Sequence, residues 1–470
     1  MKVSNRAEQY LEKADKLYLR FLTNLSHIFF SDIKKLILII FVINLCLIID
    51  VAICTSPEFI QEQIMSPFGI STFILITSGS IFGQLYVQKF AEKDNKELLS
   101  KSKYLLRITK INKTTSYILI VNLVIVILSV IIFSKFSIIN LLLANNISVV
   151  IGSYMLGSFG LKFFMWYLER RNSIIILLYG LGFIFFAFCN FIIFMSDNFL
   201  LIEKPVFITP YMSIIYPEVQ DNIFGYIVKY WTYLQTLSFI MLLSASYILL
   251  SHYSERINRY KLIFILTLVF IIFMTSKLDS FNILDVSDDD KNLFFYYIFQ
   301  SLINTVGGVI FGYSFWIVAN KLELDNPIRR YLMMTAIGFI IIYTVTQSTV
   351  IATAYPPYGL SSLSFIISSI YLVNFGLYSS AISLSHDVQL RNKIRSLTVN
   401  HKSLLGNIGQ AQMTSELQKA ITDVKDVVDK EEQELKEKTG IESTLTKENV
   451  ENYMEQVLQE MMKSKNKSKS

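Results

Sequence analysis

Neutral polar side chains inside apolar segments are the residues of this chain best suited to bind a ligand. Asn304, Gln347 and Asn374 stand in three successive apolar segments. Facing one another, such amides would hydrogen-bond a small neutral solute or hold a small cation. The alternative role is interhelical hydrogen bonding, which typically contributes less than about 2 kcal/mol per bond in a membrane.

No catalytic or metal-binding motif accompanies these amides in the sequence. The four His and three Cys residues are scattered, without the spacing of a metal site. The chain contains no HExxH pair, phosphate-binding glycine loop or CxxC motif. An acidic run at Asp285–Asp290 lacks the glycine and spacing of an EF-hand. The sequence therefore predicts a protein that is not an enzyme and needs no cofactor or metal.

The composition indicates a membrane protein. Of the 470 residues, 53% are hydrophobic and 17% are charged, whereas soluble chains average about 25% charged residues. A single soluble globule, a disordered chain and a disulfide scaffold are excluded. The net charge of +6 matters less than the positions of the charges, so the expected partner is the lipid bilayer and not nucleic acid.

Ten apolar segments are long enough, or nearly so, to cross the hydrocarbon as helices. They cover residues 36–54, 68–88, 115–134, 147–168, 173–195, 226–250, 262–276, 293–319, 331–353 and 361–384. The predicted fold is an all-α polytopic bundle of about ten transmembrane helices with a cytosolic helical C-terminal tail.

Lysine and arginine residues alternate between the two sides of this bundle. Residues 1–35 carry seven of them and the connection 89–114 carries eight, whereas the connections 55–67 and 354–360 carry none. Because basic loops stay on the cytoplasmic side, we expect both termini in the cytosol and the body in the cell membrane.

Three regions follow from these patterns. Residues 1–35 have apolar residues at helical spacing and are expected to form an amphipathic cytosolic segment. Residues 36–386 form the transmembrane bundle. Residues 387–470 form a cytosolic tail, helical and coiled-coil-like at first and ending in a disordered lysine-rich stretch. A stripe from Leu390 to Ile408 repeats every three or four residues and predicts a helix that continues directly from the last span.

A weak internal repeat relates spans four to six to spans eight to ten. Gly157–Gly160 is similar to Gly308–Gly312, and Gly182-Phe-Ile is similar to Gly338-Phe-Ile. The tripeptide Leu-Ser-Phe starts at both Leu237 and Leu363. These matches indicate a parallel repeat of the kind found in some transporters. Their spacings differ by several residues, so chance similarity is the alternative.

Glycine pairs in the spans permit close helix packing. Gly79 and Gly83 form a Gly-x-x-x-Gly motif, as do Gly308 and Gly312. Small residues at this spacing let two helix backbones approach each other. We expect packing within the chain, and a homo-oligomer is the alternative.

Ionisable residues are rare in the spans. Asp50 lies near the outer end of the first span, where we expect it to reach water, and Lys162 lies near the inner end of the fourth. No buried carboxylate is expected near the midplane, which disfavours a proton-coupled carrier.

The last third of the chain carries a resemblance to a known family. The segments Ala354–Leu360, Tyr378–Ser383, Asp387–Arg395 and Leu404–Gly409 resemble an uncharacterised family of multi-pass integral membrane proteins from ammonia-oxidising archaea. The resemblance implies a multi-pass membrane location and assigns no activity or site residue.

Two functions remain in competition. The first is a membrane sensor or signalling scaffold, because the last span precedes a helical tail suited to a cytosolic protein partner. The second is a transporter or channel for a small neutral or cationic solute, based on the repeat and the polar residues of spans eight to ten. A structural subunit of a larger complex needs no site at all.

Overall fold

The computed structural model describes most of the bundle and part of the tail. The described residues are 33–54, 67–92, 102–133, 138–169, 173–203, 223–253, 259–275, 290–322, 326–346, 358–386, 404–416, 418–419 and 430. The predicted amphipathic segment 1–35 lies almost wholly outside them, as do Gln347 and the end of the tail.

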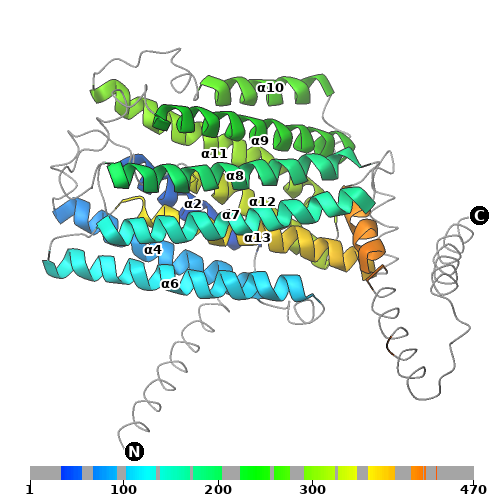
Figure 1. The fold of residues 1–470 in the computed structure, drawn as a ribbon, viewed down its shortest axis with the longest axis horizontal. Helices are drawn as coiled ribbons and strands as arrows, with labels where there is room; N and C mark the ends of the chain where they lie inside the picture. Colours follow the sequence, from blue (N-terminus) through cyan, green and yellow to red (C-terminus); the bar gives the residue numbers. More distant parts are fainter. Residues whose placement is uncertain are drawn as a thin grey trace, which may run out of the picture.

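Ten long helices and no strand occur in the described residues. They are α2 (Ile33–Cys54), α4 (Pro67–Glu92), α6 (Lys103–Phe133), α7 (Ile138–Glu169), α8 (Ile174–Glu203), α9 (Ile223–Tyr253), α10 (Arg259–Thr275), α11 (Asp290–Asn320), α12 (Pro327–Val345) and α13 (Leu360–His386). They lie side by side as one elongated bundle, with α10 at one edge and α6 at the other (Figure 1). Each helix coincides with one predicted apolar segment, because only a helix satisfies its backbone internally in lipid.

Seven of these helices are long and apolar enough to span a membrane. The spans are Pro67–Phe90, Lys103–Ile132, Leu142–Glu169, Ile174–Met195, Lys229–Ser251, Pro327–Val345 and Leu360–Ser385. The described apolar parts of α2 and α11 are shorter, Phe41–Asp50 and Thr305–Asn320, and α10 has 17 residues. The chain is therefore a multi-pass membrane protein by length and composition, and ten crossings stay a prediction.

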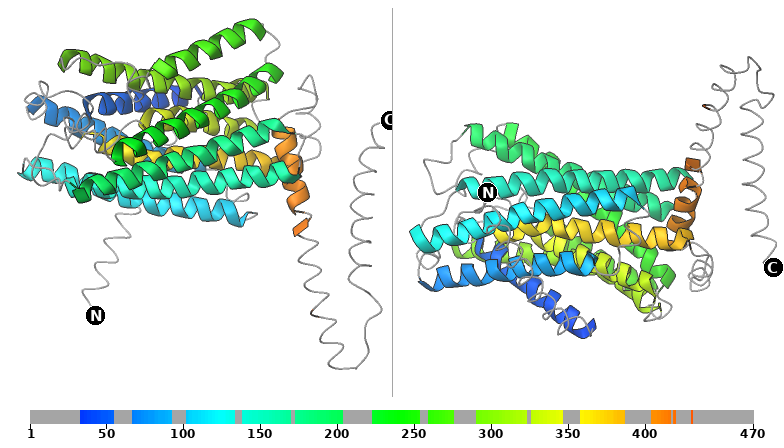
Figure 2. Two further views of the ribbon diagram at one scale, coloured as in Figure 1. Left: turned by 45° about the horizontal axis from the view of Figure 1, so that its top comes forward. Right: turned by 90° about the horizontal axis from the view of Figure 1, so that it is seen from below.

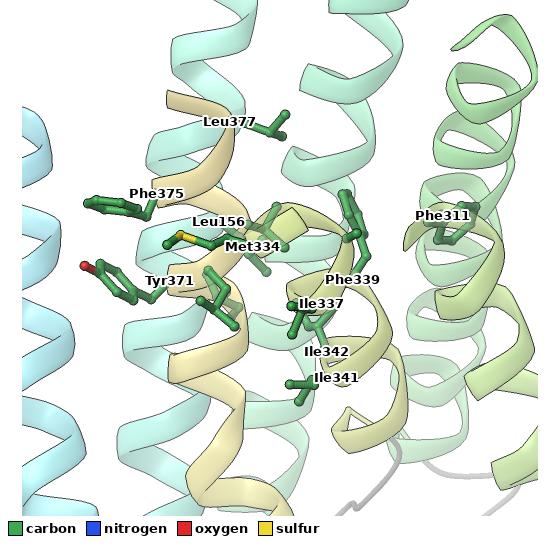
Figure 3. Close-up of a cluster of buried hydrophobic side chains, with 14 of the residues drawn as sticks. Leu156, Phe311, Met334, Ile337, Phe339, Ile341, Ile342, Tyr371, Phe375 and Leu377 are labelled. Atoms are coloured by element: carbon green, nitrogen blue, oxygen red, sulfur yellow. The ribbon is translucent and has the colours of Figure 1, made fainter. Parts of the chain in front are cut away.

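Helix α13 is the central element of the bundle. Its most apolar window is buried throughout, and α2, α4, α6, α7 and α12 pack around it. Figure 3 shows Tyr371 and Phe375 projecting from α13 on one side while Ile337 and Ile341 of α12 lie on the other. In contrast, α6 exposes a row of apolar side chains such as Val121, Ile125 and Ile132, as expected for a helix that faces lipid.

Glycines allow the closest helix contacts within the chain. A Cβ atom added to Gly312 would lie 2.5 Å from the Ala336 carbonyl oxygen of α12, and one added to Gly338 would lie 2.7 Å from a methyl of Val373 on α13. One added to Gly83 would lie 3.0 Å from the Phe365 ring. These glycines pack helices of the same chain, as expected. Gly79 has no atom within 4 Å of such a Cβ, so it makes no close helix contact within the described residues.

The two halves of the predicted repeat make equivalent contacts in their first two helices. On α7 and α8, Phe159 lies 5.3 Å and Phe163 lies 5.7 Å from Phe183, measured between ring centres. On α11 and α12, Phe311 lies 6.1 Å and Phe315 lies 5.6 Å from Phe339.

The glycine contacts of the two units match as well. A Cβ added to Gly160 would lie 3.0 Å from the Gly180 carbonyl oxygen. In the same way, a Cβ added to Gly312 would approach the Ala336 carbonyl oxygen. Phe183 and Phe339 stack on each other with their centres 6.0 Å apart. The two units therefore contact each other through corresponding residues, which supports the repeat and places aromatic rings between the units.

The third helices of the two units pair in a different register from the one predicted. On α9, the Ser238 hydroxyl donates to the Gly182 carbonyl at 2.9 Å. A Cβ added to Gly182 would meet Leu242 of α9, and one added to Gly338 would meet Val373 of α13. These two residues lie four positions after Ser238 and Ser369. Ser238 therefore corresponds to Ser369 and not to Ser364, so the match of the two Leu-Ser-Phe tripeptides is wrong by five residues.

Candidate functional site

Asp50 of α2 is fully buried, so the expectation that it reaches water is wrong. One carboxylate oxygen accepts a hydrogen bond from the Gly359 amide at 3.1 Å. The other accepts from the Ser362 amide at 3.0 Å and from the Ser362 hydroxyl at 2.8 Å. Because α13 begins at Leu360, the amides of Gly359 and Ser362 stand at its start and have no carbonyl partner within the helix. The helix dipole favours a negative charge at this end.

The turn that precedes α13 is fixed to α4 as well. The Tyr358 hydroxyl donates to the Gly69 carbonyl at 2.7 Å, and its ring packs edge-on against Phe73 at 5.7 Å between centres. Gly359 has a φ of 89°, a conformation that side chains with a Cβ rarely adopt. The start of α13 is therefore held by α2 and α4 together.

Polar side chains of three helices meet along one face of α13. We call this set the polar seam: Thr77, Ser80 and Gln84 on α4, Thr109, Asn112 and Ser116 on α6, and Ser361, Ser364, Ser368 and Tyr371 on α13. On each helix the residues recur every three or four positions, which places them on one face. The seam runs from the Asp50 end of α13 to about its middle.

Direct hydrogen bonds cross the polar seam at several levels. The Gln84 amide donates to the Ser364 hydroxyl at 2.6 Å, and the hydroxyls of Ser116 and Ser368 lie 3.4 Å apart. Farther along, the hydroxyls of Thr109 and Tyr371 lie 3.2 Å apart. These bonds fix the rotation of α13 relative to α4 and α6.

The carbonyl oxygen of the Gln84 side chain has no hydrogen-bond partner and is buried. The Ser364 hydroxyl does not donate to the Gln84 oxygen, because this hydroxyl donates to the Ser361 carbonyl at 2.7 Å. A buried acceptor without a partner costs about 1–3 kcal/mol. Gln84 is therefore the position in the seam with capacity for one more hydrogen-bond donor.

The opposite end of α13 meets the described part of the tail. Residues 404–416, which we call the tail helix, lie across the ends of α7, α8 and α13, drawn in orange in Figures 1 and 2. Leu404, Leu405, Ile408 and Ala411 of the tail helix are buried. A Cβ added to Gly409 would lie 2.5 Å from the Leu384 Cβ, so the tail helix sits directly against α13.

This position revises the predicted direct continuation of the last span. Leu384 and Gly409 are in contact, whereas in one straight helix they would be separated by about 37 Å at 1.5 Å per residue. The stripe that includes Leu404 and Ile408 serves the docking of the tail helix onto the bundle. A coiled-coil-like extension of α13 is not supported.

Polar contacts also hold the tail helix. The Trp166 indole donates to the Gln412 side chain at 3.0 Å, and the Asn407 amide donates to the Ser173 hydroxyl at 3.0 Å. The Trp166 ring stacks on Tyr378 of α13 with centres 5.7 Å apart. The side chain of Glu416 accepts from Gln412 at 2.8 Å and interacts electrostatically with Lys162.

Of the three predicted site residues, the structure describes the side chain of one. Asn374 is buried on α13 and donates to the Met155 carbonyl at 3.1 Å. This contact is the interhelical role weighed as the alternative, although its side-chain oxygen has no partner. Asn304 lies on α11, but its side chain, like Gln347 as a whole, is outside the described part. Their predicted grouping is therefore untested.

Comparison with known proteins gives no relative from which a site could be transferred. No family model, no curated protein and no solved structure matches this chain.

Proposed function

We propose that the protein is a membrane sensor or signalling scaffold that passes a change in its bundle to the tail helix and to a cytosolic protein partner. One observation carries this proposal: the two ends of the buried helix α13 are both tied, to Asp50 at one end and to the tail helix at the other. The 27-residue α13 is about 40 Å long. The proposal places both termini in the cytosol and the body in the cell membrane.

The packing of α13 favours its movement as a rigid unit. A Cβ added to Gly338 or Gly376 would meet backbone atoms of the neighbouring helix, Ser369 and Tyr331 respectively, so α12 and α13 touch backbone to backbone. Close-packed interfaces of this kind have discrete arrangements and are not continuously deformable. A displacement of α13 at its Asp50 end therefore presses Leu384 against Gly409.

Hydrogen exchange tests this coupling in the full-length protein reconstituted in nanodiscs. Asp50→Asn keeps the side-chain shape and removes the charge that the first turn of α13 binds. We expect the amides of residues 404–416 to exchange at least tenfold faster in this variant. The matched control is Asn122→Leu, which removes a partly buried hydrogen bond of 2.9 Å between α6 and α7 and leaves the start of α13 intact. Equal protection of the tail helix in wild type and Asp50→Asn would contradict the proposal.

A transporter or channel for a small neutral or cationic solute is the second candidate. The polar seam and the free Gln84 oxygen favour it, as does the parallel repeat, since transporters are often built from such units. The aromatic stack of Phe183 and Phe339 lies between the two units, at the interface where transporters built from repeats bind their solutes, which argues against it. Uptake into liposomes that is unchanged by Asn304→Ala and Gln347→Ala would remove the solute site predicted from the sequence.

A further inference from the structure

Asp50 is an unusual residue for the interior of a membrane protein. A carboxylate there is costly unless it is paired or hydrogen-bonded, and such residues are functional by default. The three hydrogen bonds from the first turn of α13 favour its charged form, whereas its complete burial favours the neutral form. The two effects oppose each other, so the protonation state of Asp50 depends on the hydrogen bonds from the start of α13.

No cation neutralises Asp50 among the described side chains. The ionisable groups that interact with it are the Cys46 thiol on α2 and the Tyr358 phenol ahead of α13. On α4 the basic residue Lys89 lies 20 positions beyond Gly69, about 30 Å along the helix.

The other two neighbours of α2 place no charge near Asp50. On α12, Arg329 and Arg330 stand in the first turn, at the end near the tail helix. The described side chains of α11 before Lys321 carry no charge. Among the side chains that the structure describes on these helices, no basic group compensates the carboxylate.

Asp50 also lies close to one end of its helix. It stands four residues before the end of α2 at Cys54, about 6 Å along the helix axis. This end of the bundle is opposite the tail helix, because Asp50 and the tail helix contact the two ends of α13.

We propose that Asp50 is the site where the sensor binds its stimulus, a proton from the side of the membrane opposite the tail helix. This inference rests on the proposed sensor function. The proton adds to one carboxylate oxygen as the pH falls and returns to water as it rises. Protonation removes the charge that the first turn of α13 binds, which weakens three hydrogen bonds at once and releases the start of the helix.

Trp166 provides a reporter at the far end, because its ring stacks on Tyr378 and its indole N–H bonds Gln412 of the tail helix. The chain has three Trp residues, so Trp231→Phe with Trp316→Phe leaves Trp166 as the single source of indole fluorescence. The experiment uses this full-length protein in proteoliposomes and varies the pH on the Asp50 side.

We expect acidification to shift the Trp166 emission to longer wavelength, as the tail helix loosens and water reaches the indole. Asp50→Asn should show the low-pH emission at every pH. Ser362→Ala keeps the carboxylate and removes one donor to its charged form, so its transition should lie at higher pH than in wild type. This second variant keeps the test decisive if Asp50→Asn folds poorly.

Titration beside the reporter is the competing explanation, since Glu416 and Lys162 lie near Trp166. A transition that persists in Asp50→Asn and disappears in Glu416→Gln would overturn the proposal. If Asp50→Asn changes the emission and pH does not, coupling through α13 stands and the proton proposal fails. If neither Asp50→Asn nor a change in pH alters the Trp166 emission, both the proton proposal and the proposed sensor function fail.

Discussion

The hydrogen bond between Gln84 and Ser364 should have a different effect on stability depending on which of the two residues is replaced. The Gln84 amide donates to Ser364 at 2.6 Å, while its carbonyl oxygen is buried without a partner. Removing Ser364 leaves the whole amide unpaired, whereas removing Gln84 also removes the unpaired oxygen. The energetic cost therefore depends on which partner is replaced.

We expect Ser364→Ala to lower the free energy of unfolding by about 1–3 kcal/mol, because it strands a buried donor. Gln84→Leu should change it by less than about 1 kcal/mol, since an apolar side chain of similar size replaces an amide that is only half satisfied. Reversible unfolding in mixed micelles measures both values. A larger loss for Gln84→Leu than for Ser364→Ala would show that the Gln84 oxygen has a partner that stabilises the native protein.

Individual polar residues were the hardest feature to predict from the sequence. Asp50 was expected to reach water because of its place near a span end, and burial by the turn at Tyr358 and Gly359 is a tertiary effect that no local pattern contains. No motif marks Gln84 or Ser116, although their polar neighbours recur every three or four residues on α4 and α6. The matching pattern on α13 was the signal that could have found them.

At the scale of the helices, the apolar segments predicted all ten elements. Their lengths differ from the predicted ones at several ends. Helix α6 begins at Lys103, 12 residues before the predicted span, because a helix can include the basic residues that a scan for apolar segments leaves out. Helix α12 ends at Val345, before the predicted end at residue 353. It also begins earlier than predicted, at Pro327, where Asn326 caps the helix by accepting a hydrogen bond from the Ile328 amide at 3.0 Å.

The docking of the tail helix depends on the missing side chain of Gly409. In Gly409→Ala, the added Cβ would lie 2.5 Å from the Leu384 Cβ, so the tail helix must move away. Gly79→Ala is the matched control, because nothing lies within 4 Å of its added Cβ. We expect limited proteolysis to cleave residues 404–416 several-fold faster in Gly409→Ala and at the wild-type rate in Gly79→Ala. Equal cleavage of both variants would mean that the tail helix is not held against α13.

The repeat makes a paired prediction about helix packing. Gly160→Ala and Gly312→Ala each place a Cβ against a backbone carbonyl of the next helix, at 3.0 and 2.5 Å. Both should lower stability by about 1–3 kcal/mol, the usual cost of overpacking. In Gly157→Ala the nearest atom is the Ala187 Cβ at 3.6 Å, an ordinary contact that should be tolerated. If thermal unfolding shows Gly160→Ala and Gly312→Ala to be as stable as Gly157→Ala, the two units do not pack as equivalents.

At the scale of the whole molecule, the order of the helices and the composition were sufficient to predict a multi-pass α-helical bundle. The central position of α13 was not predictable from the sequence, because it depends on contacts between distant segments. These segments are α2, α4, α6, α7 and α12. The return of the tail helix onto the bundle depends on Gly409 and Leu384, which are far apart in the sequence and carry no motif.

The account depends on α13 joining two opposite sides of a membrane. With Cys46, Cys54 and Cys189 replaced, single cysteines at Gln61, in the connection that precedes α4, and at Gln410, in the tail helix, report the two sides. We predict that a membrane-impermeant maleimide labels position 61 in intact cells, and labels position 410 only after the membrane is permeabilised. Labelling of both positions in intact cells, or of neither, would contradict the account.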